Sequence, residues 1–209
     1  MGDPPAQPFH LTARDHGVLA TKDEDYVLLT WDHIKEVIAS ADYEGLTRQP
    51  SQLRAYMAWS SQVREEYGST TNFLLQKRLR WTPLTSVDED PALRFAMKNP
   101  VPFAARSDYR ILLNDWPYGN EPGITHICVW LKTPLPVDSV KGALTAEGTA
   151  MVNAFIKNEI EQPLKVEDQD KVLWFKNYTS LQSIRTIDHV HVLIRGLDLS
   201  KIDKILEKP

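Results

Sequence analysis

Two histidines alternate with apolar residues in a segment near the C-terminal end of the chain. If residues 188–195 form a β-strand, His189 and His191 share one face with Arg195, and the apolar residues between them lie on the other. Imidazoles titrate near neutral pH and can donate or accept protons in catalysis, and they also ligate zinc. A functional and a structural role are equally compatible with this pair, although two imidazoles on one strand face seldom fill a core.

A second apolar segment, residues 124–132, places His126 and Cys128 on one face of another strand. If the two strands are neighbours and these faces coincide, three imidazoles and one thiol share a surface. His126, His189 and His191 could then bind a catalytic zinc ion or act as acid–base groups. For His126 alone we favour a structural role, and we expect Cys128 to be a small buried residue rather than a nucleophile.

The loop before the second strand contains two carboxylates, Asp115 and Glu121, among prolines and glycines that stiffen and turn it. Carboxylates at such positions could bind a cation, and a guanidinium fits best because it pairs with a carboxylate through two hydrogen bonds. The alternative is that Asp115 caps the turn. The residues by themselves favour packing of Trp116 and Tyr118 onto the core.

Basic side chains are concentrated between residues 48 and 80, where six of them are accompanied by two glutamates and give a local net charge of +4. They are Arg48, Arg54, Arg64, Lys77, Arg78 and Arg80. Such a segment can follow a phosphate backbone, although solvated helix faces have similar compositions. The whole chain has a net charge of -4 and a pI near 5.9, which argues against a protein that coats nucleic acid by bulk charge.

Composition predicts an ordinary folded domain. The 209 residues are 42% hydrophobic and 25% charged, which is typical of globular proteins, and the chain is long enough for one core. A single cysteine excludes a disulfide framework. Neither an apolar run of membrane-spanning length, nor a secretory signal, nor a nucleotide-binding motif occurs, so we expect a cytoplasmic protein without membrane contact or cofactor. Residues 1–8 indicate a disordered tail and residues 9–209 a single domain.

Periodicity predicts helices in the first half of the chain and strands in the second. The predicted helices begin at Thr30, at Pro50, after Gly68-Ser69, at Thr145 and at Ser200, and the predicted strands are 109–114, 124–132, 172–177 and 188–195. Residues 82–102, with three prolines, indicate a long irregular connection. This order favours an α+β fold in which an antiparallel sheet of about four strands is covered by helices on one face.

Six short motifs occur in an order that is typical of one protein family. They are Tyr67-Gly68-Ser69, Arg78-Leu79-Arg80-Trp81, Asn114-Asp115-Trp116-Pro117-Tyr118-Gly119, Ile124-Thr125-His126 continuing to Trp130-Leu131-Lys132, Trp174-Phe175-Lys176-Asn177 and His189-Val190-His191-Val192. Together they resemble the fungal domain family typified by the N-acetylglucosamine-induced protein. Some fungal members of that family are arginine-containing cyclodipeptide synthases, which take arginyl-tRNA and a second aminoacyl-tRNA and close the two amino acids into a diketopiperazine.

The resemblance implies an aminoacyltransferase that needs no ATP, because an amine attacks an ester that is already activated. It implies a general base, for which His189 and His191 are candidates, and His126 and Asp115 are further catalytic candidates. The residues assigned to substrate binding are Glu121, Asn114, Trp116, Tyr118, Asn177 and Lys176, with Asp115 and Glu121 as the carboxylates for the arginine side chain. The residues assigned to binding of the tRNA are Arg48, Arg54, Lys77, Arg78 and Arg80.

The same chemistry asks for two further kinds of group. Candidate donors to an oxyanion are Asn177 and Thr125, and candidate nucleophiles for a covalent aminoacyl-enzyme are Ser69, Ser183 and Cys128. Two other functions stay open at this point. One is a metal-dependent hydrolase that uses the three histidines, and the other is a non-catalytic protein of the amino-sugar response.

Overall fold

The computed structural model describes residues 11–85 and 94–206. They form two compact units, one of residues 11–78 and 116–121 and the other of residues 79–85, 94–115 and 122–206. The predicted tail over residues 1–8, and residues 86–93 of the predicted irregular connection, lie outside the described residues. The expectation of one domain over residues 9–209 stays a prediction.

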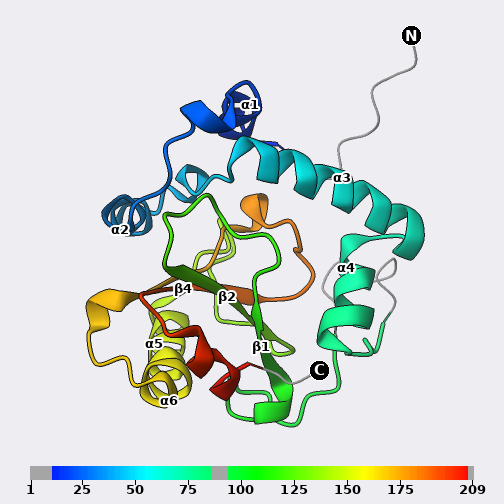
Figure 1. Cartoon of the computed structure of the whole chain (residues 1–209). Helices are drawn as coiled ribbons and strands as arrows, with labels where there is room; N and C mark the ends of the chain where they lie inside the picture. The colour runs from blue at the N-terminus through cyan, green and yellow to red at the C-terminus, as the bar shows by residue number, and fades with distance from the viewer. Residues whose placement is uncertain (1–10, 86–93, 207–209) are drawn as a thin grey trace. The chain divides into compact units, whose positions relative to one another are not determined.

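Helices dominate the first unit. They are α1 (Ala13–Leu19), α2 (Trp31–Ser40), α3 (Pro50–Tyr67) and α4 (Thr70–Phe73). Two 3-10 turns lie between them, η1 (Asp23–Asp25) and η2 (Tyr43–Gly45). Helix α4 continues into a π-helical turn, η3 (Leu74–Leu79), whose last residue belongs to the second unit. Figure 1 shows these helices in blue and cyan. None of the helices in the described part of the chain is both long and apolar enough to span a membrane.

Local sequence signals set the ends of these helices as predicted. The Thr30 side chain accepts a hydrogen bond from the His33 N–H (3.2 Å) at the start of α2, and Pro50 begins α3. Gly68 ends α3 with φ at +79°, a left-handed conformation that a residue with a Cβ rarely adopts. Ser69 then caps α4 by accepting from the Asn72 N–H at 3.0 Å.

A four-stranded antiparallel sheet forms the centre of the second unit, in the order β1-β2-β4-β3 (Figure 1). Its strands are β1 (Tyr109–Leu113), β2 (Ile124–Leu131), β3 (Val172–Phe175) and β4 (His189–Arg195). The two histidine-bearing strands are neighbours, and their register pairs Cys128 with His191 and Trp130 with His189. The predicted α+β class, with helices first and an antiparallel sheet second, is confirmed.

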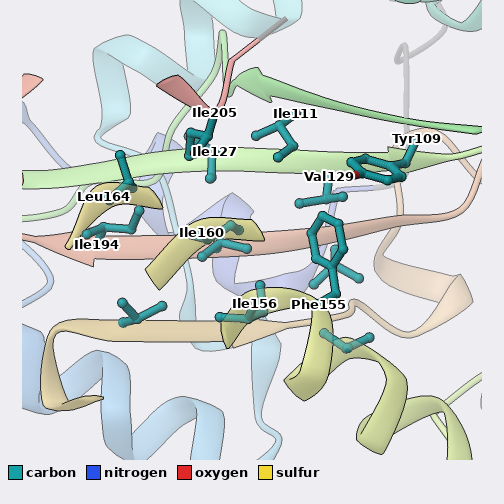
Figure 2. Packing of buried hydrophobic residues seen from close by; sticks show 14 of the residues in the cluster. Tyr109, Ile111, Ile127, Val129, Phe155, Ile156, Ile160, Leu164, Ile194 and Ile205 are labelled. Atoms are coloured by element: carbon teal, nitrogen blue, oxygen red, sulfur yellow. The ribbon is translucent and has the colours of Figure 1, made fainter. Parts of the chain in front are cut away.

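One face of this sheet is covered by helical segments of the same unit. They are α5 (Ala146–Phe155), the π-helical η5 (Ile156–Glu161), α6 (Gln162–Leu164) and the 3-10 helix η8 (Leu199–Lys204), while shorter turns are η4 (Arg106–Asp108), η6 (Gln169–Lys171) and η7 (Thr179–Leu181). Figure 2 shows Ile156 and Ile160 packed with Ile127, Val129 and Ile194 of the sheet. Because side chains alternate along a strand, the residues between these apolar ones must lie on the opposite face.

Backbone hydrogen bonds hold the loop 116–121 within the first unit, and side chains pack closely around Gly119. Gly119 donates its N–H to the Thr47 carbonyl and its own carbonyl accepts from the Leu29 N–H, both at 2.8 Å. A Cβ on Gly119 would lie 2.5 Å from the Tyr26 hydroxyl oxygen. That hydroxyl hydrogen bonds to the Thr47 hydroxyl at 2.9 Å, so the Tyr26 ring cannot move aside without losing a contact.

We expect Gly119→Ala to lower the free energy of unfolding by about 1–3 kcal/mol, because the added methyl group collides with the Tyr26 ring. Gly17→Ala is the matched control: its Cβ meets open space in α1, where alanine is the better helix former, so stability should stay equal or rise. Urea unfolding at neutral pH measures both. Equal stability of the two variants would show that the loop is not tightly seated.

Candidate functional site

The sheet face opposite the core brings two imidazoles and the thiol together. His126 Nε2 lies 3.0 Å from His191 Nδ1, and Cys128 Sγ lies 3.4 Å from the same nitrogen. This meeting follows from the register, because Cys128 lies directly across from His191 and His126 is the next residue of β2 on that face. His191 Nδ1 is therefore the position at which the three groups can share a proton.

Two asparagines and a phenylalanine hold the imidazoles in place. Asn177 Nδ2 lies 3.4 Å from His191 Nε2, and Asn114 Nδ2 lies 3.2 Å from His126 Nε2. Phe175 stacks on the His191 ring, with ring centroids 4.9 Å apart and planes 8° from parallel. Both imidazoles and the thiol are buried, with at most 8% of any of them exposed. The structure thus brings five of the candidate residues into one cluster: His126, His191, Asn114, Asn177 and Cys128.

The contacts of His191 match those of an acyl-transfer base. A nucleophile within hydrogen-bond reach of an imidazole, whose other nitrogen is oriented by a third group, is the arrangement found in cysteine, histidine and asparagine triads. Cys128, His191 and Asn177 supply these three parts. The two ends of an amide exchange by a 180° turn, so the Asn177 oxygen can accept a hydrogen bond from His191 Nε2–H. In this tautomer His191 Nδ1 has no proton and can accept one from the Cys128 thiol.

The same cluster fits a metal ion. The donor atoms of His126, Cys128 and His191 all lie within 4.8 Å of one another, and all three residues are buried. Thiolate and imidazole ligands suit zinc, and three protein ligands leave a position open for a water molecule. The group differs from the predicted three-histidine site in one member: among the described residues it contains Cys128 and not His189, whose ring stacks on Trp130.

His189 has different surroundings from His191. Its ring stacks on Trp130 with centroids 4.3 Å apart, and its Nδ1 lies 3.0 Å from the Ile187 carbonyl oxygen, to which it donates. Burial lowers the pKa of the His189 imidazole to about 4, against the opposing effect of the Ile187 carbonyl. A neutral, stacked imidazole with one nitrogen committed to the backbone is suited to holding the sheet face together.

The other predicted residue of the Trp174–Asn177 motif, Lys176, forms a buried ion pair. Its Nζ lies 3.1 Å from Asp188 Oδ1, and the second oxygen of Asp188 accepts the Leu135 N–H at 2.7 Å. Lys176 thereby joins the end of β3 to the start of the neighbouring strand β4. This places it in a structural role rather than among the groups that meet at His191.

The predicted cation-binding loop holds a cation of its own. The guanidinium of Arg48 donates to the Trp116 carbonyl at 3.2 Å and lies over the Tyr56 ring at 4.6 Å and the Tyr118 ring at 5.5 Å. Trp116 in turn packs against Tyr56 with ring centroids 5.3 Å apart. The expectation that Trp116 and Tyr118 pack within the fold therefore describes what they do in the first unit.

Glu121 caps a helix instead of presenting a carboxylate to a ligand. Its Oε1 accepts the Trp31 N–H at 3.1 Å, at the positive N-terminal end of α2. This contact gives Glu121 a structural role at the start of α2, and its assignment to the arginine side chain stays a prediction. Asp115 is exposed and directly follows Asn114, which contacts His126.

The basic residues predicted to bind tRNA are divided between the two units. Arg54 Nη2 lies 4.0 Å from Asp23 Oδ1, and Lys77 Nζ lies 5.5 Å from the centre of the Tyr67 ring. Arg78 is half-buried in the same unit as these two, whereas Arg80 belongs to the second unit. Their joint role in binding tRNA stays a prediction.

Of the three candidate nucleophiles, Cys128 has the base beside it. Ser69 caps α4, and Ser183 is exposed on the segment after η7. The sequence analysis placed Cys128 and the three imidazoles on one surface, but it did not identify His191 as the residue directly across from Cys128 on the next strand. The signal that could have revealed the pair is the alternation of both strands combined with their register.

The chain is similar to fungal proteins and to one protein family. The family model described as "Protein of unknown function (DUF3605)" matches residues 30–195. "N-acetylglucosamine-induced protein 1" of Candida albicans is 29% identical over 185 residues, covering 85% of this chain and 72% of that protein. "Uncharacterized protein YPL067C" of Saccharomyces cerevisiae is 33% identical over 166 residues, covering 78% and 77%.

A solved structure is similar as well. The "Crystal Structure of HTC1" superposes with a TM-score of 0.66 at 28% identity and covers 85% of this chain and 95% of that one. The curated relatives confirm the resemblance that the six sequence motifs indicate. The matched region contains both strands of the histidine and cysteine cluster.

The buried His189 makes stability depend on pH. Its folded pKa of about 4 lies below the ordinary value of 6.5, so the unfolded chain binds more protons between these values. The stabilisation by neutral His189 is complete above pH 6.5 and is lost as the pH falls toward 4. At pH 5 the loss of free energy of unfolding from this one group is about 2 kcal/mol.

His189→Gln should therefore lose less free energy of unfolding between pH 7 and pH 5 than the wild type does, as measured by urea unfolding. His33→Gln, which changes an exposed histidine, serves as the control and should keep the wild-type dependence. A His189→Gln protein with an unchanged pH dependence would mean that His189 is protonated in the folded state.

Proposed function

The chain belongs to the family described as "Protein of unknown function (DUF3605)", and we propose that this member is an aminoacyltransferase, a tRNA-dependent cyclodipeptide synthase that joins arginine to a second amino acid. The observation that carries the proposal is the contact of Cys128 Sγ with His191 Nδ1, with Asn177 on the other ring nitrogen. A thiol, a base and an orienting amide are the parts that acyl transfer from an activated ester requires. The resemblance to arginine-containing cyclodipeptide synthases supplies the substrate class.

In the first step His191 Nδ1 takes the Cys128 proton, and the thiolate attacks the ester carbonyl carbon of arginyl-tRNA. The C–S bond forms, the ester C–O bond breaks, and the proton returns from His191 to the ribose oxygen that leaves. The product is an arginyl thioester on Cys128 together with free tRNA. Burial of the cluster keeps water away from the thioester, which would otherwise hydrolyse.

In the second step the amine of the other aminoacyl-tRNA attacks the thioester, and His191 accepts the proton that the amine loses. The new amide bond releases Cys128 as its thiol, and the dipeptide stays esterified to the second tRNA. The arginine amine then attacks that ester within the same molecule, which closes the diketopiperazine and releases the tRNA. No step needs ATP, because both esters arrive activated.

The remaining cluster residues have supporting roles in this proposal. His126 Nε2 lies 3.0 Å from His191 Nδ1 and orients the ring that takes and returns the proton. Asn114 orients His126. Asp115, next to Asn114, is assigned the arginine guanidinium, since paired hydrogen bonds between a carboxylate and a guanidinium select arginine over lysine.

A second candidate function is a zinc-dependent hydrolase. The observation that favours it is the clustering of the donor atoms of His126, Cys128 and His191 within 4.8 Å. In that case the three side chains would hold the ion and an open position would take the attacking water. The two candidates assign opposite roles to Cys128, which is a nucleophile in the first and a ligand in the second.

Expression in a bacterial host, followed by mass spectrometry of the medium, tests the first candidate. We expect an arginine-containing diketopiperazine from the wild type, and a loss of about 10²–10⁴-fold with Cys128→Ala or with His191→Gln, because nucleophile and base are each required. Ser183→Ala, a change at an exposed serine, is the control and should keep the product.

Soluble wild-type protein that yields no such product would contradict the proposal. So would equal yields from Cys128→Ala and the wild type. Zinc analysis of the same untagged protein distinguishes the candidates: stoichiometric zinc that is lost in Cys128→Ala supports the hydrolase, and protein without zinc excludes it.

A further inference from the structure

A basic cleft of about 950 Å³ lies in the second unit, at the end of the sheet where β1 begins and β2 ends. It is lined by five cationic side chains and a tryptophan: Arg80, Lys98, Arg106, Arg110, Lys132 and Trp81. The described residues that line it include no aspartate or glutamate. Cations gathered around one hollow repel one another, so this arrangement favours an anion between them.

Aromatic rings hold two of the cations in fixed positions. The Arg106 guanidinium lies over the Tyr109 ring at 4.7 Å and donates to the Tyr109 carbonyl at 3.2 Å. Lys132 Nζ lies 5.4 Å from the centre of the Trp81 ring. Cations that are already positioned lose less side-chain entropy when a ligand binds.

Three of the five cations of the cleft are not neutralised by an ion pair within the described residues. Arg80, Lys98 and Arg110 form no ion pair with any residue in the described part of the chain. The nearby carboxylate, Asp108, is buried, and one of its oxygens accepts the backbone N–H groups of Lys98 and Asn99 at 2.7 and 2.8 Å. Its other oxygen lies 3.9 Å from Lys132 Nζ, so it offsets one of the five charges at most.

The backbone beside the cleft is strained at two positions. Arg80 has φ at +53° and Phe103, which precedes the lining residue Ala104, has φ at +65°. Left-handed conformations of residues with a Cβ cost about 1–3 kcal/mol and cluster at binding sites. Together with the cationic side chains, the strained backbone at Arg80 indicates that this side of the cleft binds a ligand.

We propose that the cleft binds a small molecule that carries a chain of phosphate groups, such as a nucleoside triphosphate. Three arginines provide planar donor forks that match phosphate oxygens, and two lysines add point charges. The volume lies within the range of small-molecule sites, about 300–1,000 Å³. Because Trp81 is only 8% exposed, the cleft offers no broad aromatic surface for a base, and recognition rests on the phosphates.

This site is distinct from the Cys128 cluster and needs no transfer chemistry. Arg110 lies across from Trp130 in the register, whereas Leu112 lies across from Cys128. The cleft therefore occupies the end of the sheet face whose middle carries the cluster. Binding there can be measured whether or not the protein makes a diketopiperazine.

Isothermal titration calorimetry of the full chain with inorganic tripolyphosphate tests the site. We expect saturable binding that weakens when salt is raised to about 0.3 M. Arg110→Gln and Arg80→Gln should each weaken it by about tenfold or more, the loss expected for a charge-assisted hydrogen bond. Arg110→Lys should weaken it less, because the charge stays while the fork is lost.

Lys171→Gln is the control for net charge, since this exposed lysine lies in the same unit outside the cleft, and it should bind like the wild type. Circular dichroism confirms that each variant is folded. Absence of tripolyphosphate binding by the wild type would overturn the proposal, and so would equal weakening by Lys171→Gln. Tight binding of an RNA oligonucleotide that tripolyphosphate does not displace would also overturn it, in favour of a nucleic-acid surface.

Discussion

Strand alternation against a one-sided hydrophobic core is the constraint on which the site depends. The helical segment from α5 to α6 packs on Ile127, Val129, Val190 and the other apolar residues of one sheet face. Every second residue of β2 and β4 is thereby directed to the other face. A shift of the β2–β4 register by one residue would move the imidazoles into that core, which the apolar residues resist. The core on one face therefore positions the chemistry on the other.

Burial then decides what each polar group can do. An imidazole removed from water is held neutral unless a charge or hydrogen bond opposes the effect, and each buried ring needs partners. His189 satisfies this need with a backbone carbonyl and a stacked indole, and these contacts suit it to stabilising the sheet face. His191 satisfies it with a thiol and a second imidazole, which can exchange protons, and with an amide, which can orient the ring. Two histidines on one strand face thus have different surroundings and different hydrogen-bond partners.

Local signals predicted much of the fold. Thr30, Pro50, Gly68 and Thr145 mark helix ends in the structure, and alternation placed the imidazoles and the thiol on a common face. Helix α1 was missed because it has no buried residue and so no apolar period, although Thr12 and Asp15 form a capping box. The partners of Glu121 and Arg48 were missed for another reason, since each lies more than 65 residues away along the chain. The Cys128–His191 pair required the strand register, which alternation does not specify.

We propose that Cys128 is the residue that carries the acyl group. Since it is the chain's single cysteine, a thioester has one possible position. The most direct measurement is the intact mass of the protein after brief incubation with arginyl-tRNA and acid quenching. We expect one arginyl adduct that hydroxylamine removes and that is absent from Cys128→Ser under the same treatment. Diketopiperazine formation without any such adduct, or an adduct on the Cys128→Ser protein that hydroxylamine removes as readily, would contradict it.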